Sequence, residues 1–272
     1  MTAPAIPVRL NDDFHRRGRL TAALADIAAV TGRNLIAYRR VPLLVVFSTV
    51  QPVVFVLLFR YVFGGAIRDV PGGSYVDYLM PGIFAQTVVF GAIGTAVGLA
   101  TDLNLGLIER FRSVPMARSA VLAGRTTADM MRNLFVVVLM FAVGLLIGFR
   151  VHTNVLGAVA GMLLVVLFGY AFSWIFAAVG MAVRDAETAQ AASFPVMAPL
   201  VFASTAFVPL TTMPGWLQPF AEHQPVSVTV DAVRALVGGG ATVRPVLKAL
   251  AWILGILVVS APLAVRRYRR TA

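Results

Sequence analysis

The chain has 272 residues, of which 59% are apolar and only 13% are charged, and its mean hydropathy is +0.84. This balance is typical of a protein embedded in a bilayer and excludes an ordinary soluble domain. The formal net charge of +11 does not indicate nucleic-acid binding, because the charged residues lie between long apolar runs rather than on a water-soluble basic face. The sequence contains no cysteine, which excludes disulfides, thiolate metal sites and cysteine nucleophiles.

The N-terminal segment, residues 1–40, is basic and lacks the apolar core of a signal peptide. We therefore expect the first apolar run to direct insertion. Between Leu20 and Arg40, apolar residues recur at helical spacing, which predicts an amphipathic helix on the inner membrane surface. The stripe consists of Leu24, Ile27, Thr31 and Leu35. An ordinary basic flank ahead of the first span is the alternative interpretation.

Six charge-free apolar runs follow, each close to the roughly 20 residues that a helix needs to cross about 30 Å of hydrocarbon. Their interiors lack Asp, Glu, Lys, Arg and His. We predict an all-α polytopic membrane protein with six transmembrane helices in a domain spanning residues 41–265, followed by a basic tail over residues 266–272. The runs extend from Val41 to Phe59, Leu79 to Ala100, Asn133 to Phe149, Val155 to Val183, Ala189 to Leu210, and Ala249 to Val265.

The distribution of basic residues predicts the orientation, because positively charged flanks are retained in the cytoplasm. Most of the 23 Lys and Arg residues lie in the N-terminal segment, the loop from Thr101 to Arg132, the short loop at Arg184, and the tail. Both termini are therefore expected on the cytoplasmic side of a bacterial inner membrane. An even number of spans independently requires the termini to share a side.

The loop from Thr101 to Arg125 has its own helical pattern. Its apolar residues recur at the spacing of an amphipathic helix, namely Leu103, Leu107, Ile108 and Phe111. Pro115 cannot continue that helix, so we predict a turn at residues 113–115 and a second helix that begins near Arg118 or Ser119. This helix-turn-helix element would then present four charged residues on the cytoplasmic side, namely Glu109, Arg110, Arg112 and Arg118. They could dock a soluble partner, or the arginines could serve only as topology signals.

The segment from Val208 to Pro225 is too apolar for an exposed loop, yet its four prolines forbid one continuous helix. We expect short helices that fold back into the outer leaflet, with Trp216 and Phe220 in the interfacial aromatic belt. A further helix from Ser227 to Val237 should stop at three consecutive glycines that begin at Gly238. This hairpin could cap an exit path or could serve structural packing.

Three pairs of glycines four residues apart, Gly94 and Gly98, Gly144 and Gly148, and Gly157 and Gly161, give weak support for closely packed helices.

Several catalytic chemistries have no counterpart in the sequence. A phosphate-binding loop ends in Gly-Lys-Ser or Gly-Lys-Thr, but the only lysine, Lys248, follows Pro-Val-Leu. The histidines His15, His152 and His223 lack metal-ligand spacing, so no metal site is expected. The predicted spans contain no ionisable residue of the kind that ion-coupled transporters use. Energy for transport must therefore come from outside the chain, or substrate moves passively.

Three motifs carry a family resemblance. The segment Ile108-Glu-Arg-Phe-Arg-Ser-Val-Pro-Met-Ala-Arg-Ser-Ala-Val-Leu-Ala-Gly-Arg125 resembles the signature of ABC-2 type permeases, particularly the daunorubicin-resistance-like drug exporters of actinobacteria. The stretch Val183 to Gln190 is similar to the same family. So is Ala206 to Pro225, together with the following Asp231-Ala-Val-Arg234. The three motifs occur in the family's order, and the resemblance covers essentially the whole chain after residue 20.

The resemblance implies a six-helix permease with an N-terminal interfacial elbow helix, a cytoplasmic coupling helix and a re-entrant outer hairpin. The ATPase-coupling residues would be Glu109, Arg110, Phe111, Arg112, Ser113, Pro115 and Arg118. A second cytoplasmic contact would comprise Arg184, Asp185, Glu187 and Gln190. The outer hairpin would comprise Pro209, Pro214, Gly215, Trp216, Pro219, Phe220 and Pro225.

The resemblance also implies partners. Two permease halves, identical or paralogous, would pair with two ATP-binding-cassette subunits, and these would bind ATP and magnesium in place of any cofactor in this chain. The expected function is export of hydrophobic drugs or lipids by a subunit that is not itself an enzyme. A polysaccharide or glycolipid exporter is the alternative within this class, although six tyrosines and three tryptophans are few for a sugar channel. A membrane anchor for a soluble ATPase is the alternative from a different class.

Overall fold

The protein is described here by a computed structural model covering residues 19–40, 42–64, 74–107, 118–183 and 185–271. Within these residues every regular element is helical. The prediction of an all-α protein is therefore confirmed for the part of the chain that the structure describes.

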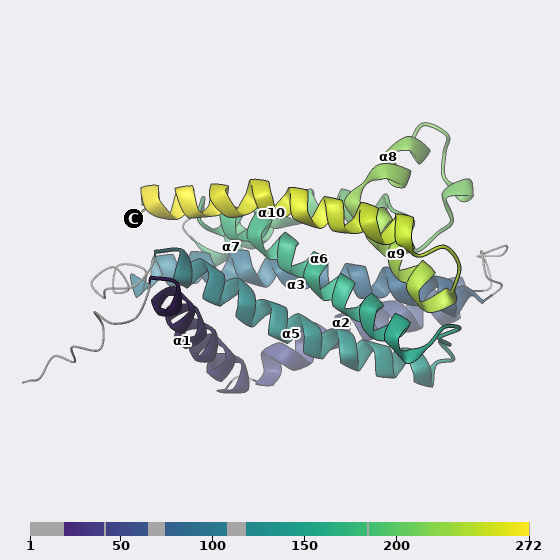
Figure 1. Ribbon diagram of the computed structural model, residues 1–272, viewed down its shortest axis with the longest axis horizontal. Helices are drawn as coiled ribbons and strands as arrows, with labels where there is room; N and C mark the ends of the chain where they lie inside the picture. The colour runs from purple at the N-terminus through teal and green to yellow at the C-terminus, as the bar shows by residue number, and fades with distance from the viewer. Residues whose placement is uncertain (1–18, 41, 65–73, 108–117, 184, 272) are drawn as a thin grey trace, which may run out of the picture.

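Four helices are long and apolar enough to cross a membrane. They run along the long axis of the molecule (Figure 1). They are α3 (Tyr75–Asn104), α5 (Arg118–Leu146), α6 (Val155–Gly180) and α10 (Val243–Thr271). Such lengths suit a bilayer because a helix satisfies its own backbone hydrogen bonds where water is absent. Four of the six predicted spans thus correspond to long apolar helices.

The other two predicted spans correspond to shorter helices. Helix α2 (Pro42–Leu57) passes into a π-helical turn, η2 (Leu58–Phe63), and helix α7 (Ala186–Phe202) has 17 residues. Helix α7 ends eight residues before the predicted boundary at Leu210, because the chain leaves the helix at Ala203 and the next residues bond elsewhere. The amide of Thr205, for example, donates to the Ser227 hydroxyl at 3.0 Å.

The helices of the second and third predicted spans are longer than the apolar runs that located them. Helix α3 continues past Ala100 to Asn104, and α5 begins at Arg118 and runs without interruption through the predicted start at Asn133. The second helix of the loop, predicted to begin near Arg118, therefore exists but is the first half of a membrane-length helix. Its charges were the reason for placing it in a loop, but Arg125, Asp129 and Arg132 form ion pairs within the helix bundle.

The core lies between α3 and α6, which pack against each other more extensively than any other pair. Glycines permit two close backbone approaches here, Gly180 between α6 and α3, and Gly82 between α3 and the segment after α7. A Cβ atom on Gly180 would lie 2.4 Å from the backbone oxygen of Ala96, and one on Gly82 would lie 2.0 Å from that of Ala206. Large aromatic side chains fill the space around these glycines, among them Phe84, Phe168, Phe172 and Phe176.

Exposed apolar side chains cover the outside of α10, including Leu254, Val258 and Val259.

The predicted amphipathic helix is present as α1 (Arg19–Arg40), and it packs against α5. The Thr31 hydroxyl donates to the carbonyl of Gly124 at 3.1 Å, and the buried Val30 rests on the same glycine. Leu24 and Leu35 of the predicted stripe are exposed. The predicted stripe is therefore divided, because Thr31 contacts α5 whereas Leu24 and Leu35 are exposed and free to face lipid.

Short helices occupy the end of the molecule remote from α1 (Figure 1). They are η3 (Leu210–Thr212), α8 (Gln218–His223) and α9 (Pro225–Gly238). Helix α9 stops where predicted, because Gly239 and Gly240 adopt φ angles of 92° and 107° that L side chains rarely tolerate. The short helices after α7 and their glycine stop are thus confirmed. Their depth in a membrane remains a prediction.

Candidate functional site

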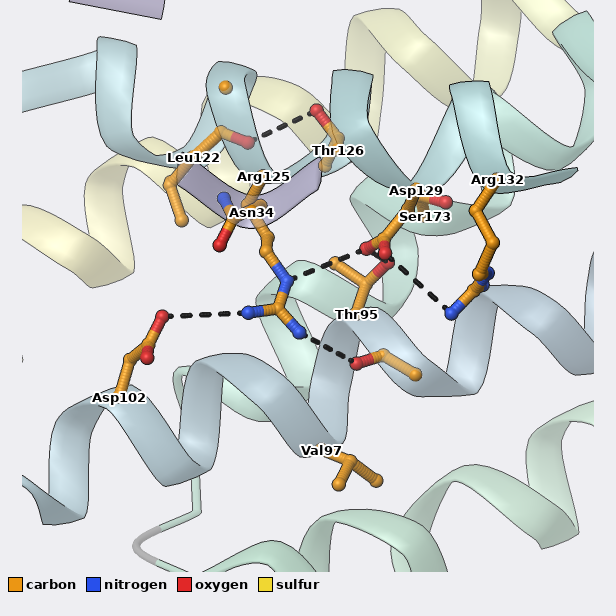
Figure 2. Close-up of polar contacts among 12 residues, drawn as sticks. Asn34, Thr95, Val97, Asp102, Leu122, Arg125, Thr126, Asp129, Arg132 and Ser173 are labelled. Carbon is orange, nitrogen blue, oxygen red and sulfur yellow. Dashed lines mark hydrogen bonds and ion pairs between the residues drawn. The ribbon is translucent and has the colours of Figure 1, made fainter. Parts of the chain in front are cut away.

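A chain of largely buried ion pairs joins α5 to α3 (Figure 2). Arg125, Asp129 and Arg132 follow one another at spacings of four and three residues, which places them on one face of α5. The Arg125 Nη1 lies 3.6 Å from Asp102 Oδ2, and its Nε lies 3.7 Å from Asp129 Oδ2. The Arg132 Nη1 lies 3.7 Å from Asp129 Oδ1. Arg33 of α1 extends the chain, at 3.5 Å from Asp102.

Asp129 is the centre of this network and is fully buried. Besides the two arginines, it accepts a hydrogen bond from Thr95 Oγ1 at 2.5 Å and another from the Tyr38 hydroxyl. Burial, and secondly the Asp129 charge, raises the pKa of Tyr38 to about 12, so the phenol remains a donor at physiological pH. The network therefore ties α1, α3 and α5 to one carboxylate.

Glycines on α3 make room for the guanidinium groups. A Cβ on Gly98 would lie 1.6 Å from Arg125 Nη2, and one on Gly94 would lie 2.9 Å from Arg132 Nη1. Arg132 Nη2 also donates to the backbone oxygen of Gly91 at 2.6 Å. The Gly94 and Gly98 pair thus accommodates buried arginines rather than the backbone of a second helix, which corrects the interpretation of that motif.

Next to the network lies a cavity of about 440 Å³ between α2, α3, α5 and α7. Buried polar side chains from α3 and α5 form its inner wall, namely Gln86, Thr87 and Asn133 beside Arg132. Exposed residues from α2 and α7 border it on the other side, namely Gln51, Gln190 and Phe194. The cavity therefore combines a polar inner wall with a partly apolar opening.

A largely buried arginine links α9 to the helix bundle. Arg234 of α9 donates to the backbone oxygens of Tyr78 on α3 and of Thr205 after α7, the latter at 2.7 Å. Its guanidinium also lies over the Tyr78 ring, 3.6 Å from the centroid, and pairs with Asp231 at 2.9 Å. Arg234 is the last residue of the Asp231-Ala-Val-Arg234 motif. In the described part of the chain, the motif therefore joins α9 to α3 and to the segment after α7.

The predicted ATPase-coupling residues from Glu109 to Pro115 lie outside the described residues, as does Arg184. Arg118 begins α5. Asp185 caps α7, since it accepts the amide of Thr188 at 2.7 Å, and the hydrogen bonds from Thr188 lower the pKa of the carboxyl. Glu187 lies in the first turn of α7, and Gln190 borders the cavity instead of joining a cluster with Asp185.

The predicted hairpin residues fall into three groups. Pro219 and Pro225 lie at the starts of α8 and α9, where a missing amide hydrogen costs nothing. Pro209 is buried and extended ahead of η3. Four residues at or near the tip are exposed, namely Pro214, Gly215, Trp216 and Phe220. Trp216 is 80% exposed, as a residue in a membrane interface would be in the absence of lipid.

Sequence reasoning missed the charge network and the cavity. The spacing of Arg125, Asp129 and Arg132 was a usable signal, because opposite charges on the same face of a helix can neutralise one another. Gln86 and Asn133 were a second signal, as polar side chains at or inside apolar runs. The contact of Arg234 with Tyr78 had no signal, because it joins residues 156 positions apart.

The long apolar helices define a multi-pass membrane protein. Residues 25–237 match the model of a family described as "ABC-2 type transporter", and the chain belongs to this family. It is 36% identical to a daunorubicin resistance ABC transporter permease protein of Streptomyces coeruleorubidus, over 93% of this chain and 89% of that protein. It is 30% identical to a probable doxorubicin resistance ABC transporter permease protein of Mycobacterium tuberculosis, over 92% and 90%. The resemblance seen in the sequence is confirmed.

Proposed function

We propose that this chain is the permease subunit of an ATP-binding-cassette exporter that moves hydrophobic drugs or lipids out of the cytoplasm or the inner leaflet. The observation that carries the proposal is the family match over residues 25–237, together with relatives named as drug-resistance permeases that align over about nine tenths of the chain. The four long apolar helices are consistent with it.

The proposal includes a topology. Six spans would be completed by α2 with η2 and by α7, with both termini in the cytoplasm of a bacterial cell. The elbow segment 1–40, the domain 41–265 and the tail 266–272 keep the limits proposed from the sequence, although α10 continues through residue 265 without a break. The basic ends of α1 and α10 support this orientation, because cytoplasmic flanks retain arginine.

A separate subunit would bind and hydrolyse ATP with magnesium. The segment 108–117 would contact that subunit, because it joins α3 to α5 at the end of the molecule where α1 and the C-terminus also lie (Figure 1). A second permease, identical or paralogous, and membrane lipid would complete the assembly. Of the alternatives, a non-transporting anchor predicts no substrate-stimulated ATPase activity in proteoliposomes, whereas an exporter predicts it.

The first test is the recovery of the partner. The chain, tagged and extracted gently from its native membranes, should bring down an ATP-binding-cassette subunit that mass spectrometry identifies. Arg112→Glu should reduce that recovery about tenfold or more, because it reverses a charge in the coupling segment while leaving the apolar helices intact.

The matched control is Arg150→Glu, since Arg150 is exposed and lies beyond the opposite end of α5. It should recover the partner as the native chain does. Equal recovery with Arg112→Glu and the native chain would contradict the coupling role of the segment, and repeated recovery of the native chain alone would contradict the exporter assignment.

A further inference from the structure

The cavity between α2, α3, α5 and α7 has an unusual charge for an apolar helix bundle. Among the described residues that line it, one is a cation, Arg132, and none is acidic. The nearest carboxylate on the same helix, Asp129, does not line the cavity. A ligand in the cavity therefore meets the positive partner of the ion pair and not the negative one.

The ion pairs do not neutralise this positive charge completely. Arg132 shares the single carboxylate of Asp129 with Arg125, so this carboxylate offsets the positive charge of Arg132 only in part. In a low-dielectric interior a partly offset charge attracts an anion much more strongly than it would in water. Of these three residues, Arg132 is the one that borders the cavity.

Three buried polar atoms at the inner wall have no hydrogen-bond partner within the described structure, namely Arg132 Nε, Asn133 Nδ2 and Gln86 Oε1. Two of these are donors, and the Gln86 amide can present its NH2 group after rotation by 180°. Buried polar groups are normally satisfied, because an unmade hydrogen bond is costly. A ligand rich in acceptor oxygens would satisfy these groups once their side chains rotate toward the cavity, because none of the three atoms is itself exposed to it.

The remainder of the cavity suits an apolar body. Phe90 and Ile93 line it from α3, and Phe194 lies at the exposed side. A volume of about 440 Å³ is within the range that binds a drug-sized molecule or a lipid head group with part of its chain. The site thus separates a polar, cationic wall from an aromatic opening.

We propose that this cavity binds the anionic head group, carboxylate or phosphate, of an amphiphile, with Arg132 as the charge partner, Gln86 and Asn133 as hydrogen-bonding groups, and Phe90 and Phe194 against the apolar part. The proposal rests on the proposed function in one respect, because it names the head-group chemistry of the cargo. The proposed site would bind acidic amphiphiles and anionic lipids in preference to cationic amphiphiles.

The test measures binding to the purified full-length chain in detergent micelles, without any ATPase. Three fluorescent probes of equal chain length are compared: a fatty acid, a phosphatidylglycerol and an alkylamine. We expect both anionic probes to bind, and Arg132→Gln to weaken each about tenfold or more, because a hydrogen bond to a charged group is lost. The alkylamine should bind more weakly than either anion, and Arg132→Gln should not weaken it.

Because Arg132→Gln also perturbs the ion pair with Asp129, a second variant leaves the network intact. Gln86→Leu removes one unpartnered buried group and should weaken the anionic probes several-fold without lowering the melting temperature. Arg150→Gln is the matched control, since it removes an exposed arginine far from the cavity, and it should bind all three probes as the native chain does.

Binding of phosphatidylglycerol but not the fatty acid, with loss in both cavity variants, would support the site and identify lipid as its source. Binding of the fatty acid alone, with the same losses, would support the site and indicate an acidic amphiphile as cargo. Tighter binding of the alkylamine, or anion binding unchanged in Arg132→Gln and Gln86→Leu, would overturn the proposal. Failure to recover an ATPase would overturn the exporter assignment without affecting this binding result, so the two failures are distinguishable.

Discussion

Asp129 shows how a membrane-length helix tolerates charge. Two guanidinium groups, a phenol and a threonine hydroxyl surround its carboxylate, and none of its surface is exposed. A buried pair of this kind adds little net stability, because desolvation of the ions offsets their attraction, but removal of one partner leaves an uncompensated charge. The consequence is that the network fixes how α1, α3 and α5 fit together more than it lowers the energy of the fold.

The substitution Asp129→Asn tests this view. It leaves Arg125 and Arg132 without their shared carboxylate, so we expect the free energy of unfolding to fall by about 3–5 kcal/mol. The measurement is the temperature at which the purified chain loses its monodisperse peak in size-exclusion chromatography.

Asp185→Asn is the matched control, since asparagine caps a helix about as well as aspartate does. Its melting temperature at neutral pH should stay near that of the native chain. An Asp129→Asn chain that melts together with this control would show that the buried pairing is not needed for the fold.

At the scale of helices, sequence analysis predicted which segments are helical more reliably than where each helix ends. Long charge-free runs located α3, α6 and α10, because apolar composition is sufficient to identify a buried or lipid-facing helix. The start of α5 was found through the proline rule, yet its length was missed, since pairing of its charges depends on residues of α1 and α3. Tertiary contacts of that kind are absent from any local pattern.

Sequence analysis predicted less of the candidate site than of the helices. The family signature located the segment 108–117, which the structure does not describe, whereas the cavity and the Arg234 contacts emerged only from packing. Gln190 illustrates the difference, because the motif grouped it with Asp185 while the structure places it at the cavity. Neighbours in sequence four or five residues apart on a helix can serve separate sites.

Helix packing makes a prediction about glycine. Gly82→Ala places a methyl group 2.0 Å from the backbone oxygen of Ala206, and neither backbone can yield without disturbing the segment that Arg234 holds. We expect a loss of about 1–3 kcal/mol in the free energy of unfolding. Thermal unfolding of the purified variant measures it.

The same substitution at Gly32 is the control, because a Cβ there meets nothing within 4 Å and the residue lies inside α1. Gly32→Ala should be neutral or stabilise the chain by up to about 1 kcal/mol through helix propensity. Destabilisation by Gly32→Ala and not by Gly82→Ala would contradict the packing described for α3.

The whole molecule has two chemically different ends. Charged helix termini, α1 and the basic end of α10 gather at one end, and the short helices α8 and α9 lie at the other (Figure 1). The proposed orientation puts the first end in the cytoplasm, because arginine-rich flanks are retained there.

Single cysteines test this orientation on a background free of native cysteine. Gly215→Cys, at the exposed tip between η3 and α8, should react with a membrane-impermeant maleimide in intact spheroplasts. Leu105→Cys, exposed just after α3, should react only after permeabilisation. The reverse pattern would invert the topology, and labelling of both sites in intact spheroplasts would contradict a membrane-spanning α3.

The charge network also bears on biosynthesis. A lone helix with three arginines and an aspartate is costly to transfer into lipid. The groups that pair with those of α5 all belong to segments translated earlier: Tyr38 on α1, and Thr95, Asp102 and the Gly91 carbonyl on α3. When α5 leaves the ribosome, its polar partners have therefore already been synthesised. The order of the helices along the gene matches the order in which the bundle can be assembled, and a circular permutant that begins at α5 would lose that advantage.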